Sequence, residues 1–123
     1  MAMANVLVIE DDDLNQFTIK KYLDEKFNPI ITDSADGAHV ILQNNKIDLI
    51  LMDISISGER HGLELTAELK ASKNYSQIPI IAVTAHASEK DRINSFAAGC
   101  DDYIAKPFRK SELLLRISKF LEF

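Results

Sequence analysis

Short runs of apolar residues alternate along this chain with longer stretches in which apolar residues recur every three or four positions. Uninterrupted apolar runs are typical of strands that are buried on both faces of a parallel sheet. Five such runs predict strands at 6–9, 30–32, 49–52, 80–83 and 103–105, with the second of them nearer an edge of the sheet.

The longer stretches predict five helices between and after these strands. In the first, Asp12 or Asp13 can cap the start, Ile19, Leu23 and Phe27 recur at fours, and Asn28-Pro29 ends the pattern. A second helix is expected from Ala38 to Asn44-Asn45, and a third around Leu65 and Leu69 as far as about Ala71. A fourth is expected around Ile93, Phe96, Ala97 and Cys100, with Gly99 as its stop. The last is expected to run to the end of the chain, with an apolar stripe of Leu113, Leu114, Ile117, Phe120 and Leu121. Asp36-Gly37 is expected to form a turn, and 54–62 a loop.

This alternation predicts an α/β fold in one domain over residues 1–123, with helices covering both faces of a parallel sheet. In such a sheet every strand ends at the same rim, where ligands bind. Glu10, Asp11, Asp53, Thr84 and Lys106 follow or end four of the strands, and we therefore expect them to converge. Each of them alone is also consistent with a solvated loop or strand-end residue; together they favour a site.

Composition narrows the classes of function. The 123 residues carry a net charge of −5 and 46% hydrophobic residues, which supports a folded core and gives no electrostatic reason to bind nucleic acid or an anionic membrane. The one cysteine, Cys100, excludes an internal disulfide and favours a reducing compartment. With no signal-peptide pattern at the start and no membrane-length apolar run, we expect a cytoplasmic protein.

The expected site combines carboxylates, a hydroxyl and an amine. Carboxylates that lie together repel one another unless a cation neutralises them, and ligation by oxygen alone suits magnesium better than zinc. Lys106 could supply positive charge to a phosphoryl group, and Thr84 could donate a hydrogen bond to one of its oxygens. These groups fit phosphoryl transfer with a carboxylate as nucleophile.

The sequence resembles the receiver domain of two-component response regulators, of the single-domain type, although the chain could equally be cut from a larger regulator. The resemblance covers essentially the whole chain, and its motifs are Val6-Leu7-Val8-Ile9-Glu10-Asp11-Asp12, Asp48-Leu49-Ile50-Leu51-Met52-Asp53, Ala82-Val83-Thr84-Ala85 and Asp102-Tyr103-Ile104-Ala105-Lys106-Pro107-Phe108. It implies a flavodoxin-like sheet with strand order 2-1-3-4-5.

The resemblance also implies a role for each site residue. Asp53 would accept a phosphoryl group from a sensor histidine kinase or a histidine phosphotransfer protein, and Lys106 and Thr84 would contact that group. The metal, Mg²⁺ with Mn²⁺ as a possibility, would be held by Glu10, Asp11, Asp53 and the backbone carbonyl of Ser55. Thr84 and Tyr103 would be the switch pair, Ser55 and His86 would border the path of hydrolytic water, and the Lys106-Pro107 bond would be cis.

In receivers, phosphorylation alters a surface for partners. Here that surface would comprise the predicted fourth helix, the 103–105 strand and the last helix, around Ile93, Asp102, Tyr103 and Arg116. It would bind a downstream protein or a second copy of the chain. On this interpretation the protein is not an enzyme and catalyses only its own phosphorylation and slow dephosphorylation.

Some features depart from the family, and other readings remain open. Gly62 lies nine residues after Asp53 where relatives often have a glycine at eight, so the intervening loop is expected to be one residue longer. An unphosphorylated docking module is one alternative. An aspartate-nucleophile phosphatase is another, but it needs a second acid at position 55, which is serine. A flavin carrier would need a phosphate-binding loop where Glu10 to Asp13 place four acids.

Overall fold

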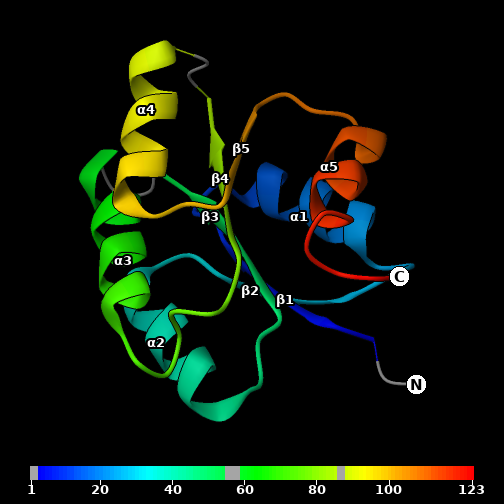
Figure 1. Ribbon diagram of the computed structural model, residues 1–123. Helices are drawn as coiled ribbons and strands as arrows, with labels where there is room; N and C mark the ends of the chain where they lie inside the picture. Colours follow the sequence, from blue (N-terminus) through cyan, green and yellow to red (C-terminus); the bar gives the residue numbers. More distant parts are fainter. Residues whose placement is uncertain (1–2, 55–58, 86–87) are drawn as a thin grey trace.

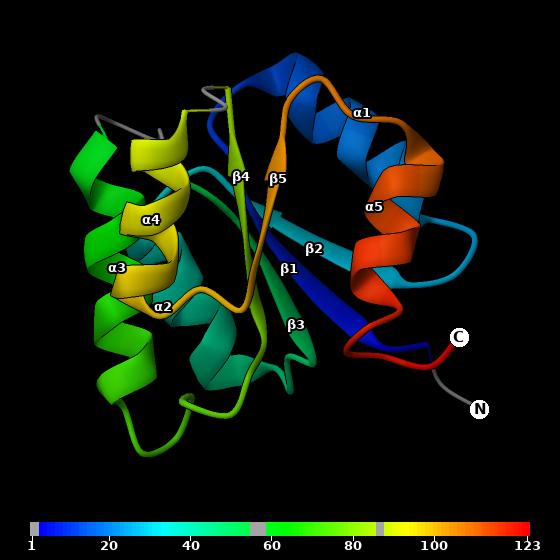
Figure 2. The ribbon, with the colours of Figure 1, turned by 45° about the horizontal axis from the view of Figure 1, so that its top comes forward.

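A five-stranded parallel sheet separates two layers of helices. The computed structural model describes residues 3–54, 59–85 and 88–123. Its strands are β1 (Asn5–Ile9), β2 (Asn28–Thr32), β3 (Leu49–Asp53), β4 (Ile80–Thr84) and β5 (Asp102–Ala105). Its helices are α1 (Asp13–Leu23), α2 (Ala35–Asn44), α3 (Glu59–Ala71), α4 (Glu89–Ala98) and α5 (Lys110–Ile117). Helices α2, α3 and α4 cover one face of the sheet, and α1 and α5 cover the other (Figures 1 and 2).

The strands lie in the order β2-β1-β3-β4-β5, as the resemblance implied. All four strand pairs are parallel, and β3 occupies the centre. Ile9 pairs with Met52, so Glu10 and Asp53 follow at the same level of neighbouring strands. Asp53 in turn pairs with Val83, and Thr84 pairs with Ala105. This register brings the polar residues at the four strand ends to one rim.

The core consists of two apolar clusters, one on each face of the sheet. Because successive side chains of a strand point to opposite faces, each central strand contributes to both clusters. Leu7 and Ile50 pack beneath α2 and α3, while Val8 and Leu51 pack beneath α1 and α5. Every residue of β3 is buried. The uninterrupted apolar runs in the sequence are thus explained by helices on both sides.

The five predicted strands are confirmed, with β2 at an edge, but two predictions about the first helices need correction. Helix α1 ends at Leu23, and Phe27 follows a turn although it is buried as expected. The chain must turn there because β2 begins at Asn28, which pairs with Asn5. Asp36-Gly37 belongs to α2 and forms no separate turn, because Ser34 caps that helix by accepting a hydrogen bond from the Gly37 amide.

The predicted loop 54–62 is wrong in its second half, because α3 already begins at Glu59. Polar and glycine content suggested a loop, but Gly62 serves close packing. A Cβ atom at Gly62 would lie 2.5 Å from the Ile54 Cα atom and 2.8 Å from the Asp53 carbonyl oxygen. The absence of a side chain therefore lets α3 approach the end of β3, which carries Asp53. The expected extra residue of the loop concerns 55–58, outside the described residues.

Helix α4 does not bury the apolar face that its sequence suggested. Ile93 is 53% exposed and Phe96 is 41% exposed, with the Arg92 guanidinium stacked over the Phe96 ring. The buried residue of α4 is Ser95, which satisfies its hydroxyl by donating to the Asp91 carbonyl. The inward position of α4 is therefore held by a small polar residue, and the larger apolar residues face outward.

The last two elements also differ from the prediction at their ends. Gly99 ends α4 in the left-handed conformation, at φ 113°, as expected of a C-terminal glycine. Cys100 therefore follows the helix instead of lying on it; it is buried, and burial raises the pKa of its thiol to about 11. Helix α5 ends at Ile117, and Phe120 and Leu121 pack against the core from beyond the helix.

Candidate functional site

The candidate site lies at the carboxyl-end rim of the sheet. Glu10 follows β1, Asp53 and Thr84 are the last residues of β3 and β4, and Lys106 follows β5. The backbone holds this rim together, because the Lys106 amide donates to the Thr84 carbonyl at 2.7 Å. Glu10, Asp53 and Thr84 are each no more than 2% exposed. Buried polar groups at the ends of three strands, with Lys106 beside them after the fourth, indicate a built site, since such groups are costly unless they are paired.

The segment between β1 and α1 carries the acidic run. Asp12 caps α1 by accepting a hydrogen bond from the Asn15 amide at 2.9 Å, which satisfies one of the helix's unpaired donors. The Asp12 amide in turn donates to Oε2 of Glu10 at 3.1 Å. The chain therefore turns sharply between strand and helix, with Glu10 buried and Asp11 exposed at the rim.

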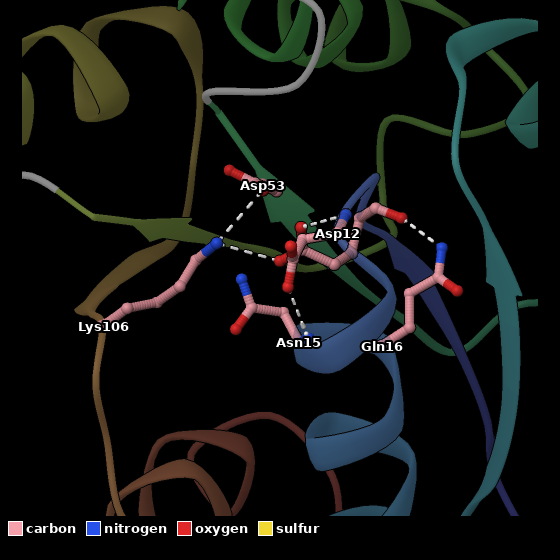
Figure 3. Close-up of polar contacts among 6 residues, drawn as sticks. Asp12, Asn15, Gln16, Asp53 and Lys106 are labelled. Carbon is pink, nitrogen blue, oxygen red and sulfur yellow. Dashed lines mark hydrogen bonds and ion pairs between the residues drawn. The ribbon is translucent and has the colours of Figure 1, made fainter.

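Lys106 joins the two buried carboxylates (Figure 3). Its Nζ lies 2.9 Å from Oε1 of Glu10 and 3.1 Å from Oδ2 of Asp53. Burial alone would lower the pKa of Lys106, but the hydrogen bond with Glu10 and the charge of Asp53 outweigh burial and raise it. Lys106 is therefore a permanently charged group between two acids.

Glu10 is the acid whose ionisation the site disfavours most clearly. Burial, and next a hydrogen bond shared with Asp53, raise the pKa of Glu10 to about 7, although Lys106 and the Asp12 amide act in the opposite direction. A single lysine therefore does not neutralise the pair of acids. The site has a deficit of positive charge that a cation would fill.

A divalent metal fits this deficit. Carboxylate oxygens of Glu10, Asp11 and Asp53 all lie within 4.8 Å of one another. The donors are hard oxygen atoms from side chains of mixed exposure, two buried and one exposed, so bound water could complete the coordination. The residues present suit magnesium and similar hard cations, and they lack the sulfur or imidazole ligands that zinc prefers.

Comparison with known proteins decides the family. Residues 6–118 match the family of the response regulator receiver domain. This chain is a member of that family. Its receiver domain is 36% identical over 124 residues to the transcriptional regulatory protein YvrH of Bacillus subtilis (strain 168), a match that covers 99% of this chain and 51% of YvrH. It is 35% identical over 118 residues to the TorCAD operon transcriptional regulatory protein TorR of Escherichia coli (strain K12), covering 95% and 50% of the two chains.

The receiver spans about half the length of these curated relatives. Among solved structures it resembles the receiver domain of the sensor histidine kinase PA1611 from Pseudomonas aeruginosa PAO1, with a TM-score of 0.86 and 32% identity. That match covers 97% of this chain and 98% of the other, and the PA1611 structure has a magnesium ion coordinated in its active site cleft. A phosphoacceptor signalling role is consistent with this family and fold.

The predicted site residues of the receiver fall into three groups. Glu10, Asp11, Asp53 and Lys106 come together as expected. Thr84 is buried at the same rim, and Tyr103 is half-buried on β5, where it pairs with Ala82. Ser55 and His86 lie outside the described residues. The Lys106-Pro107 bond is cis, as the resemblance implied.

Two features of the receiver were not anticipated from the sequence. Gln16 contacts the backbone of Glu10; a polar side chain six residues after a strand-end acid was the only signal. A groove of about 510 Å³ runs between α1 and residues 106–108, lined in part by Asn15, Tyr22, Lys106 and Phe108. Its walls come from segments far apart in sequence, so no local pattern predicts it. Within the described ranges, no helix combines the length and apolar character needed to cross a bilayer.

Proposed function

We propose that Asp53 accepts a phosphoryl group from a phosphohistidine on a sensor histidine kinase or histidine phosphotransfer protein. The observation that carries this proposal is the placement of one buried carboxylate beside a charged lysine and two further acids. Asp53 is 2% exposed, Lys106 lies 3.1 Å from its Oδ2 atom, and Glu10 and Asp11 offer oxygens within 4.8 Å. A docking module would have no need of this cluster.

The reaction is a displacement at phosphorus. An oxygen of Asp53 forms a bond to phosphorus, the P–N bond of phosphohistidine breaks, and the imidazole leaves with the electron pair. The product is an acyl phosphate on Asp53. Held by Glu10, Asp11, Asp53 and the Ser55 carbonyl, Mg²⁺ would supply charge neutralisation for the incoming phosphoryl oxygens; Mn²⁺ is a second candidate for the same ligands.

The other residues would hold the transferred group. Lys106 is already paired with Asp53, and it would exchange that contact for a phosphoryl oxygen when the carboxylate becomes an acyl phosphate. The Thr84 hydroxyl would donate to a second oxygen. Leu14 of α1 lines the groove beside Lys106 and is 71% exposed, and Phe17 of the same helix is 65% exposed. Such exposed apolar side chains suit the approach of a protein donor.

Catalysis on this proposal is limited to the receiver's own phosphorylation and its slow reversal by water. Ser55 and His86 would border the path of that water. A cytoplasmic location would give the protein access to a histidine kinase or histidine phosphotransfer protein.

The experiment incubates the protein with acetyl phosphate and Mg²⁺ and measures intact mass. The wild type should gain one phosphoryl group, and Asp53→Asn should gain none. Asp33→Asn is a matched control, because Asp33 is an exposed acid that follows β2 at the same rim; it should be phosphorylated like the wild type. Full phosphorylation of Asp53→Asn would refute the assignment.

We further propose that phosphorylation is transmitted to the surface formed by α4, β5 and α5. Thr84 would move toward the phosphoryl group, and Tyr103 would turn inward behind it. The surface contains the exposed Ile93, and Asp102 binds Arg116 at 3.0 Å and Lys119 at 3.3 Å. It would bind a downstream protein or a second copy of the chain.

Amide NMR and sizing of the protein with and without beryllofluoride test this switch. We expect shifts around Tyr103 and a change in self-association or in target binding. Shifts confined to residues that touch the ligand, with association unchanged, would leave the proposed switch without support.

A further inference from the structure

Gln16, on the first turns of α1, bonds back to the strand end that carries the acids. Its side-chain Nε2 donates to the Glu10 carbonyl oxygen at 2.6 Å (Figure 3). Its backbone amide donates to the Asp12 carbonyl at 2.9 Å. One residue therefore binds both ends of the three-residue turn that contains Asp11. The first of these bonds is not part of the regular helix, since only the side chain reaches Glu10.

This bond completes a set of contacts that leaves Glu10 little freedom. Its backbone amide donates to the Thr32 carbonyl, its carbonyl accepts from Gln16, and its carboxylate accepts from the Asp12 amide and from Lys106. Gln16 links Glu10 directly to a helix side chain. Rotation of the Glu10–Asp11 peptide would break the bond and would carry the Asp11 carboxylate away from Asp53.

We propose that Gln16 is a positioning residue for the metal site, which orients the Glu10–Asp11 peptide so that both carboxylates face Asp53. The inference rests on the proposed function, which assigns the metal to these three acids. Groups that bind and orient metal ligands typically change metal affinity by about 10–100-fold when they are removed. Gln16 is such a group, because it binds the backbone of Glu10 and orients it.

The test replaces Gln16 with methionine, which has a similar length, forms helices as well as glutamine does, and cannot donate. Gln43→Met is the matched control, because Gln43 lies exposed on α2. Mg²⁺ is titrated into each protein at a temperature where it is folded, and amide NMR shifts report the Kd. Hydrogen exchange of the Asp12 amide in metal-free protein gives a second readout, since that amide binds the Glu10 carboxylate.

We expect Gln16→Met to weaken Mg²⁺ binding by about tenfold and to speed exchange of the Asp12 amide, while Gln43→Met matches the wild type. Gln16→Lys, which keeps a donor of similar reach, should retain the protection of that amide. If Gln16→Met lowered the melting temperature but kept the wild-type Kd and amide protection, Gln16 would be structural only and the inference would be wrong. Equal loss of protection in Gln16→Lys would also overturn it.

The outcome separates this inference from the function on which it rests. If the wild type binds Mg²⁺ and is phosphorylated while Gln16→Met binds equally well, only the role of Gln16 fails. If the wild type binds no Mg²⁺, the metal site of the proposed function fails, and the positioning role falls with it.

Discussion

Replacing Glu10 with glutamine should change how the stability of the metal-free protein depends on pH. Glu10 is 1% exposed, and its two carboxylate oxygens accept from Lys106 and from the Asp12 amide. Glutamine has the same shape but only one accepting oxygen, so Glu10→Gln loses one of these hydrogen bonds at every pH. Because that cost does not change with pH, the ionisation of Glu10 is measured by how the free energy of unfolding changes with pH.

The magnitude of the slope follows from the pKa of Glu10. Its pKa rises from 4.5 to about 7 on folding. Because the folded-state pKa is the higher one, the stabilisation is complete below pH 4.5 and is lost as pH rises toward 7. Each pH unit in that window is equivalent to about 1.4 kcal/mol, so the contribution of Glu10 to the free energy of unfolding of the wild type should fall by about 3 kcal/mol. Glu10→Gln should lack this fall.

Urea unfolding across this pH range, with a chelator present, measures the difference. The gap between wild type and Glu10→Gln should change by about 3 kcal/mol over the window, whereas Glu64→Gln, at an exposed position of α3, should run parallel to the wild type. With Mg²⁺ in excess, the wild type should instead gain stability as pH rises, because the metal binds the ionised acids. Parallel curves for wild type and Glu10→Gln without metal would refute the reasoning.

Three further outcomes test the packing. Gly62→Ala should lower the free energy of unfolding by about 1–3 kcal/mol, because its Cβ would lie 2.5 Å from the Ile54 Cα atom; urea denaturation showing no loss would contradict the close approach of α3. Ile93→Ser should change stability by less than about 0.5 kcal/mol, whereas Leu65→Ala, at a buried position, should cost about 2–5 kcal/mol in the same assay; equal losses would place Ile93 in the core. The Cys100 thiol, with its pKa raised by burial to about 11, should react with a thiol reagent at neutral pH only after denaturation, and rapid labelling of the native protein would disagree.

The helix faces and boundaries show where local pattern was insufficient. Ile93 and Phe96 have helical spacing, yet α4 buries Ser95 and leaves both apolar side chains exposed. Glu59 to Gly62 have loop composition, yet they begin α3 because the glycine permits close contact with the end of β3. In both cases packing against neighbouring elements, which local composition does not report, decides which side chain is buried.

What the sequence by itself determined is the set of strands, their shared direction and the polar residue at each strand end. An uninterrupted apolar run such as Leu49 to Met52 has one stable placement, between two helix layers, and Asp53 must then emerge at the rim. The tertiary structure alone decided the distances: Lys106 between Glu10 and Asp53, and Gln16 on the Glu10 carbonyl. These contacts join residues up to 96 positions apart, and their geometry depends on sheet register and helix packing, which no single segment encodes.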